Sequence, residues 1–299
     1  MRCLRILACA ALLLLSGCGA AGPETTIPFQ SLHPAEGLDF TAARASTLAF
    51  LHAYATESSD HGDALRSLVE GSLIQEWAHW LIVQNDELPG TIRGTLRLGS
   101  VGTAKPTHLP GSQQAAISVD VQAMVTFQIT PATGKPSTVV RNLDGPVLLV
   151  PVAPGDWRVW SFTRDGAALT QFVFPLGFAG RKGDVAVRLD VLIVAPGQLQ
   201  FGAVVSNRSP LAVTLNGDET SLLDDSGKSL GSGKTVVSFP GPIPPDSVRE
   251  SLLALPPLGQ DSPDPVAMRV TLDPRGGKPI VLDVPLGAPS AGASPSPSG

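Results

Sequence analysis

The stretch ISVDVQAMVTFQI, residues 117–129, alternates apolar and polar side chains without a break. A period of two is typical of a strand that buries one face and exposes the other. The same period begins ahead of it at residues 92–98, and it continues after Pro- and Gly-containing turns at 138–143, 147–150 and 157–163. The sequence therefore predicts a meander of antiparallel strands.

Two helices are expected ahead of the meander. Residues 39–55 place apolar side chains at helical spacing, with Asp39 or Thr41 as the N-cap. A second helical pattern begins at residues 60–63 and runs to about Ile82, with a break expected near Gly71. Helices followed by antiparallel strands indicate an α+β domain.

This order of elements resembles the nuclear-transport-factor-2-like fold, in which N-terminal helices pack into the concave face of a curved sheet. The resemblance covers roughly residues 38–175, and its best local match is GDWRVWSFTRDG, residues 155–166. It implies a cone-like α+β domain over residues 38–178.

An all-β domain is expected after residue 180. Short alternating runs recur from Val185 to Leu286, separated by turn signals. The segment Phe201–Val213 resembles the paired strands of exported immunoglobulin-like modules, which implies a β-sandwich over residues 181–287. The domain boundary is expected at 176–183, and residues 246–254 fit either one helical turn or a strand.

The N-terminus has the pattern of a bacterial lipoprotein precursor. Arg2 and Arg5 precede the apolar run 6–15, which is shorter than the roughly 20 residues of a transmembrane helix. Leu15-Ser16-Gly17-Cys18 then matches the lipobox at every position. The resemblance implies a signal peptide over 1–17 and lipidation of Cys18.

Segments of low complexity flank the two expected domains. Residues 18–37 have the composition of a flexible tether between the lipid and the body. Residues 288–299, rich in Ser, Pro, Ala and Gly, predict a disordered tail.

Charge and cysteine content exclude several classes of function. The chain carries −5, and loss of Arg2 and Arg5 leaves 19 basic against 26 acidic residues, or −7. No run of Lys or Arg is present to follow a phosphate backbone, so no nucleic-acid partner is expected. Cys3 and Cys9 leave with the signal and Cys18 takes the lipid, which excludes disulfides, zinc–thiolate sites and cysteine nucleophiles in the body.

Few residues suit catalysis. Asp120 and Tyr54, the single tyrosine, are the first candidates for an acid–base pair inside a cone. Asp60, His61 and Asp63 could recruit a metal, although Asp also suits a helix N-terminus. The sequence lacks a Gly-x-Ser-x-Gly elbow, a Ser-x-x-Lys pair and a His-Glu-x-x-His helix. We therefore predict no catalytic residue, no metal site and no cofactor.

Several other groups have both a structural and a functional interpretation. Trp77 with Trp80, and Trp157 with Trp160, are expected to be core residues or to line a pocket for an apolar ligand. The acidic side chains at 218, 219, 224 and 225 fit ordinary turns or a calcium site. Asn207-Arg208-Ser209 fits a glycosylation sequon, but in a bacterial lipoprotein it predicts only a turn.

These observations favour a lipid-anchored, extracytoplasmic binding or interaction module of the bacterial cell envelope, not an enzyme. Its expected partners are the membrane, through the N-terminal lipid, and an envelope protein or a small apolar ligand. Two alternatives stay open: an enzyme or carrier that uses the cone interior, and an accessory subunit of an envelope transporter or cell-wall complex.

Overall fold

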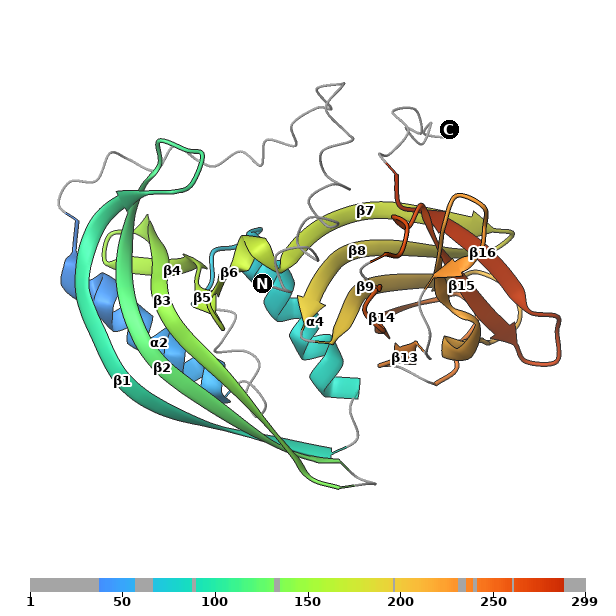
Figure 1. The fold of residues 1–299 in the computed structure, drawn as a ribbon, viewed down its shortest axis with the longest axis horizontal. Helices are drawn as coiled ribbons and strands as arrows, with labels where there is room; N and C mark the ends of the chain where they lie inside the picture. The colour runs from blue at the N-terminus through green and yellow to red at the C-terminus, as the bar shows by residue number, and fades with distance from the viewer. Residues whose placement is uncertain are drawn as a thin grey trace. The chain divides into compact units, whose positions relative to one another are not determined.

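The computed structural model describes residues 38–56, 67–87, 90–131, 135–195, 197–230, 235–238, 241–259 and 261–287. The chain divides into two compact units that meet between Pro175 and Leu176. Among the described residues, antiparallel sheets make up most of both units, and two α-helices belong to the first (Figure 1).

The first unit holds a four-stranded antiparallel sheet in the order β1-β2-β3-β4. Its strands are β1 (Gly90–His108), β2 (Ala115–Pro131), β3 (Ser137–Ala153) and β4 (Asp156–Ser161). The helices α2 (Phe40–Thr56) and α4 (Leu73–Glu87) precede them. A short hairpin of β5 (Thr163–Arg164) and β6 (Ala167–Ala168), followed by the 3-10 turn η1 (Leu169–Gln171), comes after them.

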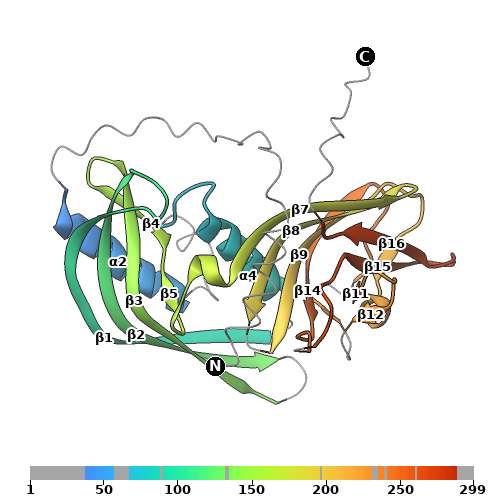
Figure 2. The same ribbon diagram turned by 45° about the horizontal axis from the view of Figure 1, so that its top comes forward.

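Strand β2 confirms the alternation on which the prediction rests. Val119, Val121 and Val125 are almost fully buried, whereas Asp120 and Gln122 are exposed. Helix α2 contacts all four strands and lies in the hollow of the curved sheet (Figure 2). The side chain of Asp39 caps this helix, because its Oδ1 accepts a hydrogen bond from the Ala42 amide at 2.9 Å.

The second predicted helix is partly wrong. Its break near Gly71 is confirmed, since α4 begins at Leu73. Residues 67–69, however, are not helical. Val69 N donates to Val159 O at 3.1 Å and Val159 N donates to Ser67 O at 2.8 Å. Backbone groups of residues 67–69 therefore form hydrogen bonds with the open edge of β4 instead of helical hydrogen bonds. Residues 60–66 lie outside the described part of the chain.

The strands after β2 also differ from the prediction. Residues 138–143 and 147–150 belong to one strand, β3, because Gly145 adopts a φ of 135° and lets the strand bend without ending. A Cβ at this glycine would lie 3.0 Å from the Thr163 side chain. The strand expected at 157–163 ends at Ser161, and Thr163 begins β5.

The second unit consists of two five-stranded antiparallel sheets, drawn as separate layers in Figure 1. One sheet has the order β13-β14-β9-β8-β7 and the other has the path β10-β15-β11-β12, with β16 paired to β15. The bounds of the first set are β7 (Val173–Lys182), β8 (Val185–Ala195), β9 (Gln198–Asn207), β13 (Val236–Val237) and β14 (Ser247–Leu255). Those of the second are β10 (Val213–Leu215), β11 (Ser221–Leu223), β12 (Ser229–Leu230), β15 (Ala267–Pro274) and β16 (Ile280–Pro285), with the 3-10 turn η2 (Gly217–Glu219) after β10.

Two boundaries in this region are settled by β7 and β14. The segment 176–183, expected as a domain boundary, is mostly strand, because β7 runs on to Lys182 and pairs with β8. The segment 246–254 is a strand and not a helical turn, since residues 247–255 pair along their whole length with β9.

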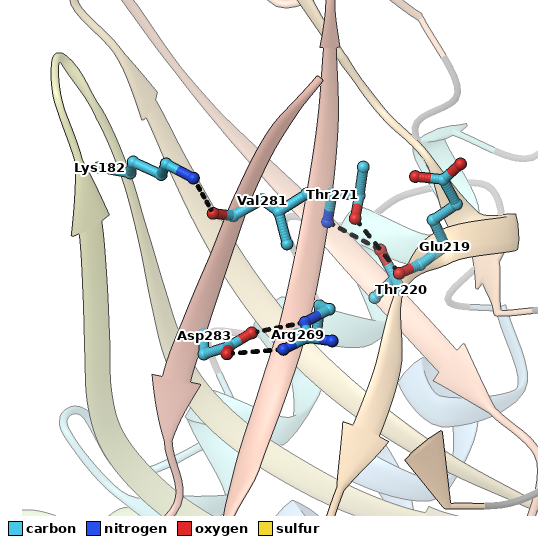
Figure 3. A network of polar contacts seen from close by, with 7 residues as sticks. All are labelled: Lys182, Glu219, Thr220, Arg269, Thr271, Val281 and Asp283. Atoms are coloured by element: carbon cyan, nitrogen blue, oxygen red, sulfur yellow. Dashed lines mark hydrogen bonds and ion pairs between the residues drawn. The ribbon is translucent and has the colours of Figure 1, made fainter. Parts of the chain in front are cut away.

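Polar contacts tie the β15–β16 side of the second unit together (Figure 3). Arg269 and Asp283 face each other across the strands and form a two-pronged ion pair with both N–O distances at 2.9 Å. Hydrogen bonding to Asp283 raises the pKa of Arg269 above its ordinary value. Lys182 Nζ donates to Val281 O at 2.9 Å, which links β7 of one sheet to β16 of the other.

Asn207 is the buried polar centre of the same unit. Its Nδ2 donates to the carbonyl oxygens of Leu211, Ile243 and Pro244 at 2.9, 3.0 and 3.0 Å. Its Oδ1 accepts from the Ser209 amide and hydroxyl. The side chain is fully buried, so the predicted turn, and not a modification site, accounts for this residue.

Val121→Asn should lower the free energy of unfolding of the first unit by about 2–4 kcal/mol, because it places an amide where apolar side chains leave no partner. Gln122→Asn makes a matched change on the exposed face and should cost less than about 0.5 kcal/mol. Urea unfolding followed by circular dichroism measures both. Equal effects would show that the facing of β2 is misassigned.

Asn207→Ala should cost the second unit about 2–4 kcal/mol, because three carbonyl groups lose their donor at once. Asn142→Ala, at an exposed side chain on β3, is the control and should leave the unfolding midpoint almost unchanged. Thermal unfolding distinguishes them, and an Asn207→Ala protein as stable as the control would contradict the assigned role.

Candidate functional site

An aromatic cluster joins the helices of the first unit to its sheet. Phe162 lies at the centre, with its ring centroid 5.1 Å from Trp77, 5.4 Å from Phe50 and 5.9 Å from Tyr54. Tyr54 also stacks on Trp77 at 5.8 Å. Such separations are those of favourable aromatic pairs. The cluster thus connects α2, α4 and the segment that follows β4, and Phe127 of β2 completes it at 5.9 Å from Tyr54.

The hairpin β5–β6 places Arg164 beside this cluster. The turn residues Asp165 and Gly166 have φ values of 51° and 80°, and two positive values fit the Asp-Gly hairpin turn. Asp165 N donates to Asn142 O at 2.7 Å, and Asp165 Oδ1 accepts from Asn142 N at 2.9 Å. These two bonds fix the tip of the hairpin to β3 and so fix the backbone from which Arg164 extends.

The guanidinium of Arg164 is held by aromatic rings. Its Cζ lies 4.2 Å from the ring centroid of Phe172 and 5.6 Å from that of Trp77. Arg164 is only 9% exposed. Within the described part of the chain its side chain has no carboxylate and no hydrogen-bond acceptor as a partner.

This arrangement is costly for the fold. An arginine side chain stays charged in proteins, so burial cannot neutralise it. Dehydrating an ion costs several kcal/mol, whereas a buried cation–π contact returns about 2 kcal/mol. A group kept against the stability of the fold is typical of a functional site.

A second donor near Arg164 also lacks a partner. Trp77 is 1% exposed, and its Nε1 makes no hydrogen bond to any residue that the structure describes. Trp80, equally buried on the same helix, donates from Nε1 to Glu76 Oε1 at 2.8 Å. The difference between the two indoles shows that α4 can supply an acceptor to a buried tryptophan, but not to Trp77.

Trp77, Trp80 and Trp157 are buried in the core, as one of the two interpretations of the tryptophans predicts, and Trp160 is partly buried. Trp157 is buried on β4, while Trp160, on the opposite face of that strand, packs against a small cluster of Val69, Leu109, Ala116 and Val150. Trp77 combines a core position, next to Arg164, with a polar atom that has no hydrogen-bond partner among the described residues.

The candidate pair of Asp120 and Tyr54 is not brought together. Tyr54 is buried against Phe127, whose side of β2 also carries Val121 and Val125. Asp120 lies on the other face of that strand and pairs with Lys105 at 3.4 Å, with more than half of each side chain exposed. The sheet therefore separates the two groups.

The remaining acidic and histidine candidates do not converge. Among the described residues, no group of three or more His, Cys, Asp or Glu side chains is arranged to hold a metal. His52 and His108 are exposed, and His79 packs edge-on against Trp80. Asp60, His61 and Asp63 lie outside the described residues.

The acidic turns of the second unit have structural roles. Asp224 Oδ1 accepts bonds from the Ser226 amide and hydroxyl and from the Lys228 amide. These bonds, led by the Ser226 hydroxyl, lower the pKa of Asp224 below its ordinary value. Asp218 N donates to Asn216 Oδ1 in the turn η2. The carboxylate of Asp224 thus stabilises its own loop.

The residues predicted to carry the anchor, Cys18 and the segments 1–17 and 18–37, lie outside the described part of the chain, as does the tail 288–299. No helix among the described residues is both long and apolar enough to span a membrane.

The sequence analysis missed Arg164 as a site residue. The signal available in the sequence is one cation directly before the Asp-Gly turn at 165–166. Its neighbours at 162–168 are otherwise mostly aromatic or small residues. Alternation alone assigns Arg164 to an ordinary polar turn, because the hairpin that redirects it depends on contacts with β3.

Comparison with known proteins identifies no relative: no family model, no curated protein and no solved structure matches this chain.

Trp77→Phe should destabilise the first unit less than Trp80→Phe does. Both changes remove the same atoms from a buried site on α4, but only the second breaks a hydrogen bond. The first also removes a buried donor that has no partner, so we expect a difference of about 1–3 kcal/mol. Chemical denaturation of the two variants measures it. A larger loss for Trp77→Phe would mean that its Nε1 has a protein acceptor.

Proposed function

We propose that this chain is a lipid-anchored, extracytoplasmic binding module of a bacterial cell envelope. The guanidinium of Arg164, 9% exposed and without a carboxylate or hydrogen-bond acceptor as a partner among the described residues, carries the binding part of the proposal. The anchoring part rests on the lipobox Leu15-Ser16-Gly17-Cys18.

The arrangement of elements supports the finer fold assignment. A helix lying in the hollow of an antiparallel sheet, with a second helix joined to it through aromatic rings, is what a nuclear-transport-factor-2-like domain requires. Two antiparallel sheets in the second unit suit an immunoglobulin-like β-sandwich. We propose both assignments, with the first domain as the ligand-binding one.

A non-catalytic role fits the placement of the candidate residues. The acid–base pair expected of a cone enzyme would need Asp120 and Tyr54 on the same side of β2, and they lie on opposite sides. The neighbouring groups Arg164 and Trp77 are both hydrogen-bond donors. Donors that have no carboxylate partner among the described residues favour recognition of a ligand over proton transfer.

Cys18→Ala should abolish lipidation and leave an uncleaved precursor, because the acyl chains are attached through its thiol. Cys9→Ala is the matched control: it removes a cysteine from the apolar run and should leave lipidation intact. Mass spectrometry of the N-terminal peptide from the membrane fraction measures both. An unmodified N-terminus in the membrane-bound wild-type protein would contradict the proposal.

A further inference from the structure

We propose that Arg164 and Trp77 together bind the carboxylate of a small organic acid whose remaining part is apolar. The inference rests on the proposed binding function and names its ligand class. It concerns two neighbouring residues whose polar groups have no hydrogen-bond partner among the described residues: Arg164, which is 9% exposed, and Trp77, which is 1% exposed.

The chemistry of the two groups defines what they can accept. Both are donors only, so a single acceptor-only group satisfies both, and an ionised carboxylate is such a group. The guanidinium carbon lies 5.6 Å from the centroid of the indole ring, so the two side chains are direct neighbours, and the proposal places one small acceptor between their donors. A neutral carbonyl would leave the charge of Arg164 uncompensated.

The rings around Arg164 restrict the direction of approach. The guanidinium carbon lies over the Phe172 ring, 4.2 Å from its centroid, so the ring occupies one side of the guanidinium and a ligand must approach its N–H groups from another. A planar carboxylate binds a guanidinium edge to edge through two parallel hydrogen bonds. The site therefore matches a planar anion in the plane of the guanidinium.

Charge and surroundings favour a monoanion with an apolar body. Arg164 supplies one positive charge, and the nearby Arg141 is already engaged with Asp165 at 3.8 Å. A doubly charged phosphate would bring a second negative charge into an aromatic environment in which Arg164 supplies one positive charge. Phe162 and Phe172, whose ring centroids lie 6.5 Å apart, make the surroundings of Arg164 aromatic, which suits a ligand with an apolar body.

The guanidinium keeps a route to solvent. Among the described residues, the buried polar atoms that lack a partner are Trp77 Nε1 and Arg158 Nε, and no nitrogen of Arg164 is one of them. A carboxylate can therefore reach Arg164 first and then accept the bond from Trp77, which is shut off from water.

The test is titration of the full chain in detergent with benzoate, followed by the indole N–H signals in ¹⁵N–¹H correlation spectra. The chain has 4 tryptophans, so Trp77→Phe assigns the relevant signal. Benzoate should shift the Trp77 signal downfield and saturate. Benzamide, its neutral counterpart, and inorganic phosphate should leave that signal in place.

Variants of Arg164 decide the role of the charge. Arg164→Lys should weaken benzoate binding at least tenfold, because an ammonium cannot form the two parallel bonds, and Arg164→Met should abolish it. Arg97→Met, on the exposed face of β1, is the control and should bind like the wild type. If Arg164→Met fails to fold, the benzoate–benzamide comparison and Arg164→Lys still decide.

Three results would overturn the inference: no saturable shift with benzoate, the same shift with benzamide, or unchanged affinity in Arg164→Lys. Membrane attachment through Cys18 is measured separately. A lipidated protein that ignores benzoate would therefore reject the ligand class while leaving the proposed envelope function standing.

Discussion

The packing of Phe162 is the interaction on which the first unit depends. This one ring contacts Phe50 and Tyr54 of α2, Trp77 of α4 and Phe172 beyond the β5–β6 hairpin. The contacts join elements far apart in the sequence. They also determine where β4 ends, because the chain must leave the sheet at Ser161 to direct Phe162 inward. The position of the hairpin follows from that exit, and the position of Arg164 follows from the hairpin.

The same packing creates the electrostatic conflict that we interpret as function. Aromatic faces attract the guanidinium, but they cannot accept its hydrogen bonds as a carboxylate would. Trp77 adds a second unsatisfied donor to the same region. In the second unit, by contrast, Arg269 forms an ion pair with Asp283, and the side-chain amide of Asn207 both donates and accepts hydrogen bonds. The stability of the fold alone explains these polar groups.

The sequence predicts the helices and strands better than it predicts the contacts between them. Residues 117–129 identified β2 and the face of that strand which is buried, because period two reports directly on burial. The sequence predicts separate strands at 138–143 and 147–150, because it does not distinguish a glycine that bends one strand, as Gly145 does at positive φ, from a glycine in a turn between two strands. Residues 67–69 have helical spacing but complete the edge of β4. The local sequence around Arg164, a cation before an Asp-Gly turn, does not predict its burial, since its surroundings come from α4 and from Phe172 as much as from its own hairpin.

A crystal structure of the chain grown with benzoate tests the central claim most directly, because it shows which atoms satisfy Arg164 and Trp77. The account predicts a carboxylate in the plane of the Arg164 guanidinium, with one oxygen within hydrogen-bond distance of Trp77 Nε1, and an empty or water-filled site in crystals grown without it. A carboxylate of the chain itself bound to Arg164 in both crystals would contradict the account, because the guanidinium would then belong to an ordinary buried ion pair.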